Sequence, residues 1–347
     1  MRDSRRLYDD GVPLQPGSPD AGPRRSNLTG IVATALGLVL FAWFVSKVGL
    51  GEIWSGLAQI GWGFVPIIAL AGLRFAMRAK AWSLCLEPPH TLPFGAAFAA
   101  VVAGDAVGNL TPLGLFASEP AKAAFVRDRV PLGPAVTALA IENIFYTLSV
   151  AAMIGAATGA LLFTFDLPDA VRQAAWIWLA AIAVGFAVTA FLLWQRPAVV
   201  RRALSRLVPR TSKLQDRVDQ LHGLEEQIYT FAIRRRNVLG PLAAAEAMFH
   251  VLGVLEVYLT WWLVQGTAPP VLTAFIFEGV NRLVQVLFKF VPLRTGVDEL
   301  TTGSFTAMLG FGAALGITLA IVRKIRTIAW VLVGTSLLVR RTLGGRA

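Results

Sequence analysis

The sequence contains few of the residues that disulfide-bonded and metal-binding proteins depend on. Its single cysteine, Cys85, excludes an internal disulfide and a cysteine metal cluster. Three histidines disfavour a histidine-rich metal site, and only 15% of the 347 residues are charged, against roughly 25% in soluble domains. A Walker A motif does not occur, so ATP is not expected to drive the protein directly. We therefore expect no metal and no cofactor.

Long apolar runs dominate the chain, which is 55% hydrophobic with a mean hydropathy of +0.62. The runs are helix-length, about 20 residues, unlike the roughly ten-residue alternating segments of outer-membrane barrels. They predict an all-α polytopic membrane protein of about eight helices. The net charge is +11, but the arginines lie beside the apolar runs, which is the positive-inside pattern. Nucleic acid is therefore not an expected partner.

Composition divides the chain into four parts. Residues 1–27 predict a disordered cytoplasmic tail, because they combine prolines with scattered charges. Residues 28–194 and 238–347 predict two membrane halves, and residues 195–237 predict a basic, amphipathic cytoplasmic segment between them. Five arginines precede the first apolar run, which places the N-terminus in the cytoplasm. The last two spans are expected at about 303–321 and 327–339, with a charged loop between them.

One apolar stretch breaks the pattern of a plain membrane helix. Residues 109–122 read N-L-T-P-L-G-L-F-A-S-E-P-A-K, with Pro112, Gly114 and Pro120 interrupting the backbone. Irregular backbone at membrane depth is tolerated only where it is buried in protein or lines a cavity. Ionisable residues at that depth, here Glu119 and Lys122, indicate a functional site. We expect residues 92–127 to form either a re-entrant hairpin or a broken helix pair.

This stretch has a counterpart 180 residues further on. Pro112-Leu113 is followed by Glu119, and Pro292-Leu293 is followed at the same distance by Glu299. Paired Pro/Gly-interrupted apolar segments in corresponding halves are the best sequence indication of a transporter binding site. The sequence therefore predicts two broken or re-entrant segments related by a pseudo-repeat.

A polar stripe leads into the second broken segment. Glu278, Asn281, Arg282, Gln285 and Lys289 fall on one face of a helix over 271–291. A polar stripe on a membrane helix faces the bundle interior or an aqueous path, although a structural ion-pair network is the alternative.

Other intramembrane ionisable residues leave two interpretations open. Glu142 fits a structural role and a cavity role equally well. Arg74 and Arg78 share a helix face, and extension to cytoplasmic headgroups is slightly favoured over ligand contact. Glu246 and His250 have a spacing that metal ligands use, but two ligands alone are weak evidence for a metal.

These motifs carry a family resemblance. The run G-N-L-T-P-L-G-L-F-A-S-E-P-A-K-A resembles the lysylphosphatidylglycerol synthase transmembrane-region family, also called flippase-like, and F-V-P-L-R-T-G-V-D-E is similar to its second signature and to the hopanoid-associated branch. The family commonly has glycines where this chain has Ala117-Ser118 and Arg294-Thr295. The resemblance implies a bundle of about eight helices that moves or handles lipids in the bacterial inner membrane. Without a long soluble segment, the synthase reaction is not expected.

Three functions compete. The first is translocation of an anionic phospholipid or hopanoid-type lipid through a polar cavity, with Arg282, Lys122 and Lys289 contacting phosphate. The second is an accessory or scaffold subunit that contacts lipid-biosynthetic enzymes, for hopanoid or glycolipid, through residues 195–237. The third is an intramembrane enzyme, which we do not expect because no nucleophile with a nearby base is evident. The expected substrate-binding residues are Asn109, Thr111, Pro112, Gly114, Glu119, Lys122, Glu142, Glu278, Asn281, Arg282, Gln285, Lys289, Asp298 and Glu299.

Overall fold

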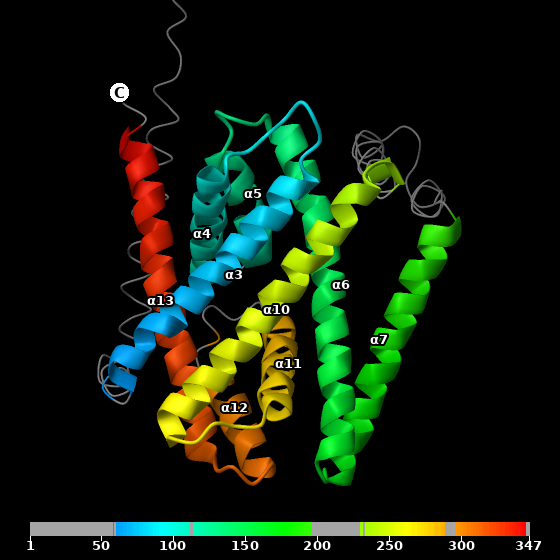
Figure 1. Ribbon diagram of the computed structural model, residues 1–347, viewed down its shortest axis with the longest axis vertical. Coiled ribbons are helices and arrows are strands. Elements are labelled where there is room, and N and C mark those ends of the chain that lie inside the picture. The colour runs from blue at the N-terminus through cyan, green and yellow to red at the C-terminus, as the bar shows by residue number, and fades with distance from the viewer. Residues whose placement is uncertain are drawn as a thin grey trace, which may run out of the picture.

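The computed structural model describes residues 58, 60–111, 114–195, 230–231, 233–288, 294 and 296–344. Across these residues the protein is all-helical, which confirms the predicted fold class (Figure 1). The predicted tail, the first span at 28–48 and nearly all of the basic segment 195–237 lie outside the described residues. The α-helices are α3 (Phe64–Cys85), α4 (Phe94–Leu110), α5 (Gly114–Phe125), α6 (Leu132–Thr164), α7 (Asp169–Gln195), α10 (Arg236–Gln265), α11 (Val271–Leu287), α12 (Val297–Met308) and α13 (Ala313–Gly344).

Proline and glycine set several helix ends. Pro93, Pro131 and Pro270 immediately precede α4, α6 and α11, where a fixed φ and a missing N–H cost nothing. Gly266 ends α10 in the left-handed conformation, at φ 70°. Four helical segments within the described ranges are long and apolar enough to cross a membrane, namely Gly61–Cys85, Leu132–Thr164, Asp169–Thr189 and Arg236–Gln265.

The first broken segment is a re-entrant hairpin. Helices α4 and α5 lie side by side and antiparallel, so the chain enters from the end of α3 and returns to the start of α6 on the same side (Figure 1). The helices approach closely at Gly108 and Gly114, where a Cβ on Gly114 would lie 2.3 Å from the Gly108 carbonyl oxygen. Of the two alternatives, the hairpin is therefore the observed one.

The predicted boundaries near the C-terminus were wrong. Instead of spans at 303–321 and 327–339, α12 ends at Met308 and α13 runs unbroken from Ala313 to Gly344. The charged run that suggested a loop is buried within the bundle, with Arg323 and Lys324 only 7% and 5% exposed. Helix α13 tolerates these charges because other helices supply carboxylates to it. The turn lies earlier, at Gly310 and Gly312, which both have positive φ.

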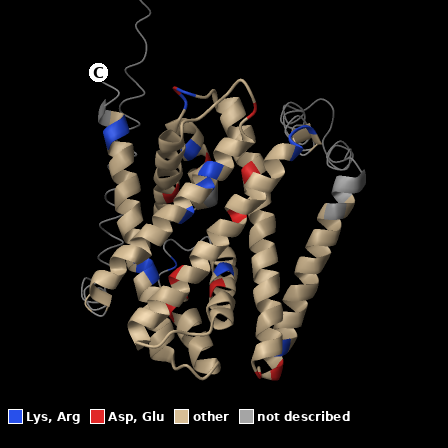
Figure 2. Ribbon diagram, viewed as in Figure 1, with Lys and Arg blue, Asp and Glu red and all other residues tan. Residues whose placement is uncertain are grey.

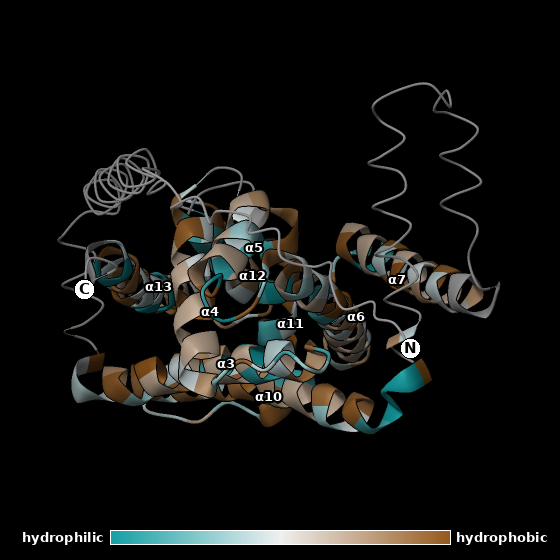
Figure 3. Ribbon diagram, turned by 90° about the horizontal axis from the view of Figure 1, so that it is seen from above, coloured by the Kyte–Doolittle hydropathy of each residue, from teal (hydrophilic) through white to brown (hydrophobic). Residues whose placement is uncertain are grey.

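The two halves of the bundle run in opposite directions. Helices α3–α6 and α10–α13 follow the same order of long helix, hairpin and long helix, but the second set is inverted in Figure 1. Their packing corresponds as well, because α13 packs along α4 as α6 packs along α11. Seen along the long axis, α3 and α10 share one side, with α13 and α6 at the flanks (Figure 3). This is an inverted-topology arrangement, in which the two hairpins enter from opposite ends.

One end of the bundle carries most of the exposed positive charge (Figure 2). We call it the basic end; its exposed or partly exposed cations include Lys80, Arg127, Arg129, Arg234, Arg235, Arg236, Arg340 and Arg341. Arg341 contacts Asp128 and Arg235 donates to the Leu84 carbonyl oxygen, which joins the end of α13 and the start of α10 to this end. The C-terminal end of α13 therefore lies on the same side as the residues that flank the basic segment.

Apolar side chains close the bundle at both ends. Trp82, Val126 and Leu242 belong to a buried cluster at the basic end. Trp261 and Phe277 belong to an aromatic cluster at the opposite end. Helix α7 packs on α6 and otherwise exposes apolar side chains, as expected for a lipid-facing helix. The buried charged side chains thus lie mainly between these two apolar clusters.

Candidate functional site

A cavity of about 560 Å³ lies where the two hairpins approach each other at mid-depth. Six cationic side chains line it, whereas Asp105 and Glu119 are its only acidic lining residues within the described part of the chain. The cations are Arg74, Arg78, Lys122, Arg282, Arg294 and Arg326. Aromatic and aliphatic side chains, including Phe249, Val286 and Trp330, complete the wall. A wall of apolar surface with a few convergent charges is typical of a ligand pocket.

Helical spacing directs these side chains inward. Arg74 and Arg78 are four residues apart on α3, and both face the cavity. We had favoured extension of these two arginines to cytoplasmic headgroups. That prediction was wrong, because both line the cavity and Arg74 is only 8% exposed. The stripe of α11 behaves as predicted, because Arg282 and Gln285 line the cavity.

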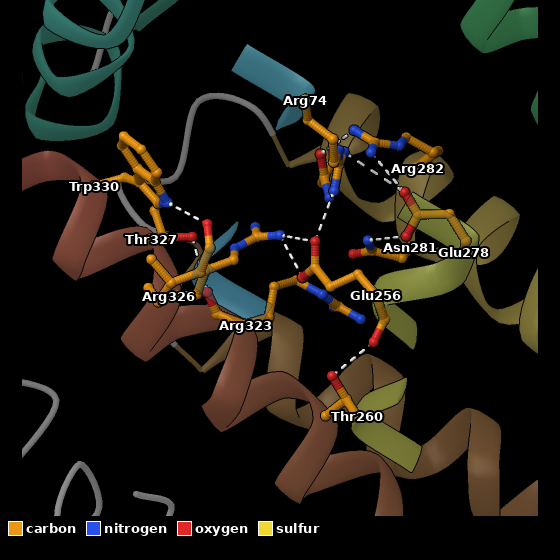
Figure 4. A network of polar contacts seen from close by, with 12 residues as sticks. Arg74, Glu256, Thr260, Glu278, Asn281, Arg282, Arg323, Arg326, Thr327 and Trp330 are labelled. Atoms are coloured by element: carbon orange, nitrogen blue, oxygen red, sulfur yellow. Dashed lines mark hydrogen bonds and ion pairs between the residues drawn. The ribbon is translucent and has the colours of Figure 1, made fainter. Parts of the chain in front are cut away.

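An arginine cluster forms one wall (Figure 4). The Arg74 guanidinium donates to Glu256 at 3.0 Å and lies 3.7 Å from Glu278. Arg282 lies 2.5 Å from Glu278, and Arg326 donates to both oxygens of Glu256. Arg74 and Arg282 also lie over the Phe249 ring, at 4.6 and 4.9 Å from its centroid, within the range of cation–π attraction.

This cluster has more cations than carboxylates. With Arg323, it contains four arginines, of which Arg326 is partly buried and the others are buried, and two buried glutamates, a local surplus of two positive charges. The Nε atoms of Arg74 and Arg282 are buried without a hydrogen-bond partner among the described residues. Guanidinium groups with unused donors at membrane depth form a site suited to an anion.

A second cluster, around Arg78, has the opposite balance. Arg78 contacts the two oxygens of Glu142 at 2.7 and 3.1 Å and lies 3.9 Å from Glu246. Its guanidinium stacks over the Tyr146 ring, at 3.7 Å from the centroid. Ser149 Oγ lies 3.2 Å from Glu246 Oε2 and 3.0 Å from His250 Nε2. One arginine thus serves two buried glutamates, which leaves a local surplus of one negative charge.

The hairpins contribute three ion pairs and one carboxylate that is paired only with an amide. On α5, Lys122 donates to Glu119 at 2.7 Å, and on α4, Asn109 donates to the Asp105 carboxylate at 2.9 Å. In the second half, Arg294 donates to Asp298 at 3.1 Å. Glu299 contacts Lys324 of α13 and accepts a hydrogen bond from the Gly296 N–H, which caps α12.

The interior charges balance in number but not in position. Among the described interior residues, eight cations (Arg74, Arg78, Lys122, Arg282, Arg294, Arg323, Lys324 and Arg326) stand against eight carboxylates (Asp105, Glu119, Glu142, Glu246, Glu256, Glu278, Asp298 and Glu299). The positive surplus lies at the arginine cluster, and the negative surplus lies around Arg78 and Asp105. The cavity is therefore polarised across its width.

The residues predicted to bind substrate fall into four groups. Those lining the cavity are Asn109, Gly114, Glu119, Lys122, Arg282 and Gln285. Those standing behind a lining cation or its partner are Glu142, Glu278, Asn281 and Asp298. Thr111 and Glu299 are not lining residues. Thr111 instead donates to the Val107 carbonyl oxygen, and Glu299 caps α12. Pro112 and Lys289 lie outside the described residues.

The sequence analysis did not identify several lining residues. Asp105 was not among the expected site residues, and Arg326 lies in the run that was expected to form the charged loop between the last two spans. Phe249 and Trp330 gave no signal, because an aromatic residue in a membrane helix usually packs in the bundle. The i, i+4 spacing of Arg74 and Arg78 was the one available signal for an inward-facing pair.

Comparison with known proteins identifies the family but no close relative. The family model described as the lysylphosphatidylglycerol synthase TM region matches residues 30–334. No curated protein and no solved structure matches the chain. The matched range includes both hairpins and the helices that carry the arginine cluster. The chain therefore belongs to the family of the lysylphosphatidylglycerol synthase TM region.

Proposed function

We propose that the protein moves a lipid with an anionic, phosphate-containing headgroup between the leaflets of the bacterial inner membrane through this cavity. The observation that carries the proposal is the arginine cluster, in which four buried or partly buried arginines stand against two glutamates. Uncompensated charge at membrane depth is costly, so a bound anion would offset the surplus. The planar fork of arginine matches phosphate oxygens well, and Arg74, Arg282 and Arg326 line the cavity.

The size of the cavity supports a headgroup as its occupant. Its volume of about 560 Å³ suits a polar headgroup but not two acyl chains, so the chains would remain in the bilayer. The apolar wall that includes Val286 and Trp330 would contact the glycerol and first methylene groups. This division matches a path in which only the headgroup crosses through protein.

The opposed hairpins support movement across the membrane. Each hairpin closes the cavity from a different end, and inverted repeats of this kind permit a site to open alternately to the two sides. The basic end would face the cytoplasm by the positive-inside tendency, together with the N-terminus. We expect no covalent step in this transfer, and hence no catalytic residue.

A translocation assay tests the proposal. Purified protein is reconstituted in vesicles with fluorescent phosphatidylglycerol or phosphatidylcholine, and accessibility to a membrane-impermeant quencher reports the leaflet. We expect protein-dependent movement that is faster for phosphatidylglycerol and is lost in Arg74→Gln and Glu119→Gln. Arg340→Gln, at an exposed arginine of the basic end, serves as the matched control and should retain movement. Folded protein that moves neither lipid would overturn the proposal and favour the accessory role with lipid-biosynthetic enzymes.

A further inference from the structure

The balance of interior charge has a consequence for any anion that enters the cavity. Eight cations and eight carboxylates make the described interior neutral by count before a ligand binds. A lipid phosphodiester carries one negative charge and would leave the interior with a net charge of −1. Because an unpaired charge at membrane depth is costly, an additional positive charge is needed when the lipid binds.

The negative surplus around Arg78 is where that charge is best accommodated. Glu142 has the closer contact to Arg78, at 2.7 Å, whereas Glu246 lies 3.9 Å away. Glu246 is only 4% exposed, and its Oε1 atom has no hydrogen-bond partner among the described residues. A buried carboxylate that is remote from its cation and incompletely hydrogen-bonded pays a desolvation penalty, which a proton removes.

The helices around Glu246 present further charged and titratable groups. Arg78 and Cys85 face it from α3, Glu142 and Tyr146 from α6, and His250 approaches through Ser149 from its own helix, α10. The pair Glu119 and Lys122 on α5 acts on Glu142, but its two charges compensate each other. The balance at Glu246 is therefore set mainly by the single cation Arg78 and the competing carboxylate Glu142.

A short hydrogen-bonded chain leads away from Glu246. Ser149 Oγ contacts both Glu246 and His250, and a hydroxyl can accept one proton while donating another. Ser149 also lies 2.8 Å from the Tyr146 carbonyl oxygen, which gives the hydroxyl a resting acceptor. His250 Nδ1 is buried without a hydrogen-bond partner in the described part of the chain, so the imidazole retains a free position. Glu246, Ser149 and His250 are not among the lining residues, so this chain runs beside the lipid-binding cavity.

We infer that Glu246 takes up one proton when a lipid phosphate occupies the arginine cluster, so that the lipid and a proton cross in the same direction. This inference rests on the proposed translocation. No other bond changes: the proton passes from water through His250 and Ser149 to a Glu246 oxygen and returns to water on the other side. Asp105, the alternative acceptor, accepts a hydrogen bond from Asn109 and lines the cavity itself, whereas Glu246 stands outside the lining.

Lipid binding must then raise the proton affinity of the protein by the same factor by which protonation raises its lipid affinity. If the bound state holds one more proton than the free state, lipid affinity is highest in acid. It falls by about tenfold per pH unit once the proton leaves the free protein. The phosphodiester of phosphatidylglycerol keeps its single charge throughout. The slope of lipid affinity against pH therefore reports a protonation of the protein and not of the lipid.

The first experiment measures this slope. The dissociation constant of fluorescent phosphatidylglycerol is measured in detergent micelles between about pH 5 and 9. We expect the slope in the wild type and a flat curve in Glu246→Gln, which carries a permanently neutral side chain of the same shape. Glu87→Gln, at an exposed carboxylate after α3 and outside the interior count, should retain the slope. A flat wild-type curve overturns the inference, and so does a slope that survives in Glu246→Gln.

The second experiment measures coupling. In vesicles with a pH gradient, wild-type protein should accumulate labelled lipid in the leaflet on the alkaline side. Ser149→Ala, which keeps Glu246 but removes the link to His250, should slow this accumulation. If the lipid crosses but its affinity does not depend on pH, the proton inference is overturned and the proposed translocation stands. If the affinity shows the expected pH dependence but the lipid never crosses, the proposed translocation is overturned and the link between lipid binding and protonation stands.

Discussion

Replacing Glu256 by glutamine tests whether the arginine cluster is organised as the structure indicates. Glu256 accepts from Arg74 at 3.0 Å and contacts Arg326 with both oxygens, while it is only 6% exposed. Glutamine fills the same space but leaves the four arginines of the cluster with one carboxylate. Removing one partner of a buried ion pair costs about 3–5 kcal/mol, because the remaining charge stays unpaired. We expect Glu256→Gln to lose free energy of unfolding in that range.

Arg74→Gln provides the comparison that makes this prediction sharp. It removes one cation from the surplus, while Glu256 keeps Arg326 and Glu278 keeps Arg282. Its cost should be limited to the lost hydrogen bond to a charged group, about 1.5–3 kcal/mol. Reversible denaturation in mixed micelles, followed by tryptophan fluorescence, gives both values. Equal losses, or a larger loss for Arg74→Gln, would refute the view that the cluster is short of negative charge.

Three further predictions address the hairpin, the loops and the topology. Gly114→Ala should destabilise the protein by about 1–3 kcal/mol, because its Cβ would meet the Gly108 carbonyl oxygen, whereas Gly133→Ala, which faces open space, should not; thermal unfolding in micelles compares them. In the loop between α5 and α6, the hydrogen bond from Arg341 lowers the pKa of Asp128, so the stability from this contact is complete above the ordinary pKa of aspartate and disappears as the pH falls through the lowered value. The difference in unfolding midpoint between wild type and Asp128→Asn should therefore shrink in acid, and a difference that grows in acid would contradict this sign. In intact cells, cysteines introduced at Arg340 and Asp166 should react with an impermeant maleimide from opposite sides, with Asp166 reactive from outside; labelling of both from one side would contradict the topology.

Local patterns predicted the hairpin and the stripe well. The Pro/Gly motif of residues 109–122 indicated a re-entrant turn because membrane backbone cannot be irregular without burial in protein. The stripe of α11 followed from helical periodicity, which places Glu278 and Arg282 one turn apart. Both features depend on residues close together in sequence, so a single sequence contains the necessary information.

Long-range pairing was not predictable in the same way. Arg74 meets Glu256 across 182 residues, and Arg326 meets the same glutamate from α13. The sequence alone gave no reason to bring these helices together, so Arg74 was assigned to headgroups and Arg326 to a loop. Hydropathy counts a charge as an interruption, although a charge with a distant buried partner can lie within a continuous helix. The errors therefore fall at the residues that form the arginine cluster.

The two inverted halves share a backbone arrangement but differ in charge where they meet. Helices α3 and α10 pack against each other as the symmetry-related pair of the bundle. Their inward positions carry arginines on α3 and glutamates on α10, joined as Arg74–Glu256 and Arg78–Glu246. Identical halves would place like charges face to face at membrane depth, where repulsion is weakly screened. The contact between the halves therefore requires their sequences to differ on these faces, and the repeat stays visible only in the hairpin motifs, which lie away from this contact. The same asymmetry separates the arginine cluster from the acidic site at Glu246, so the proposed anion and the proposed proton would bind at different places.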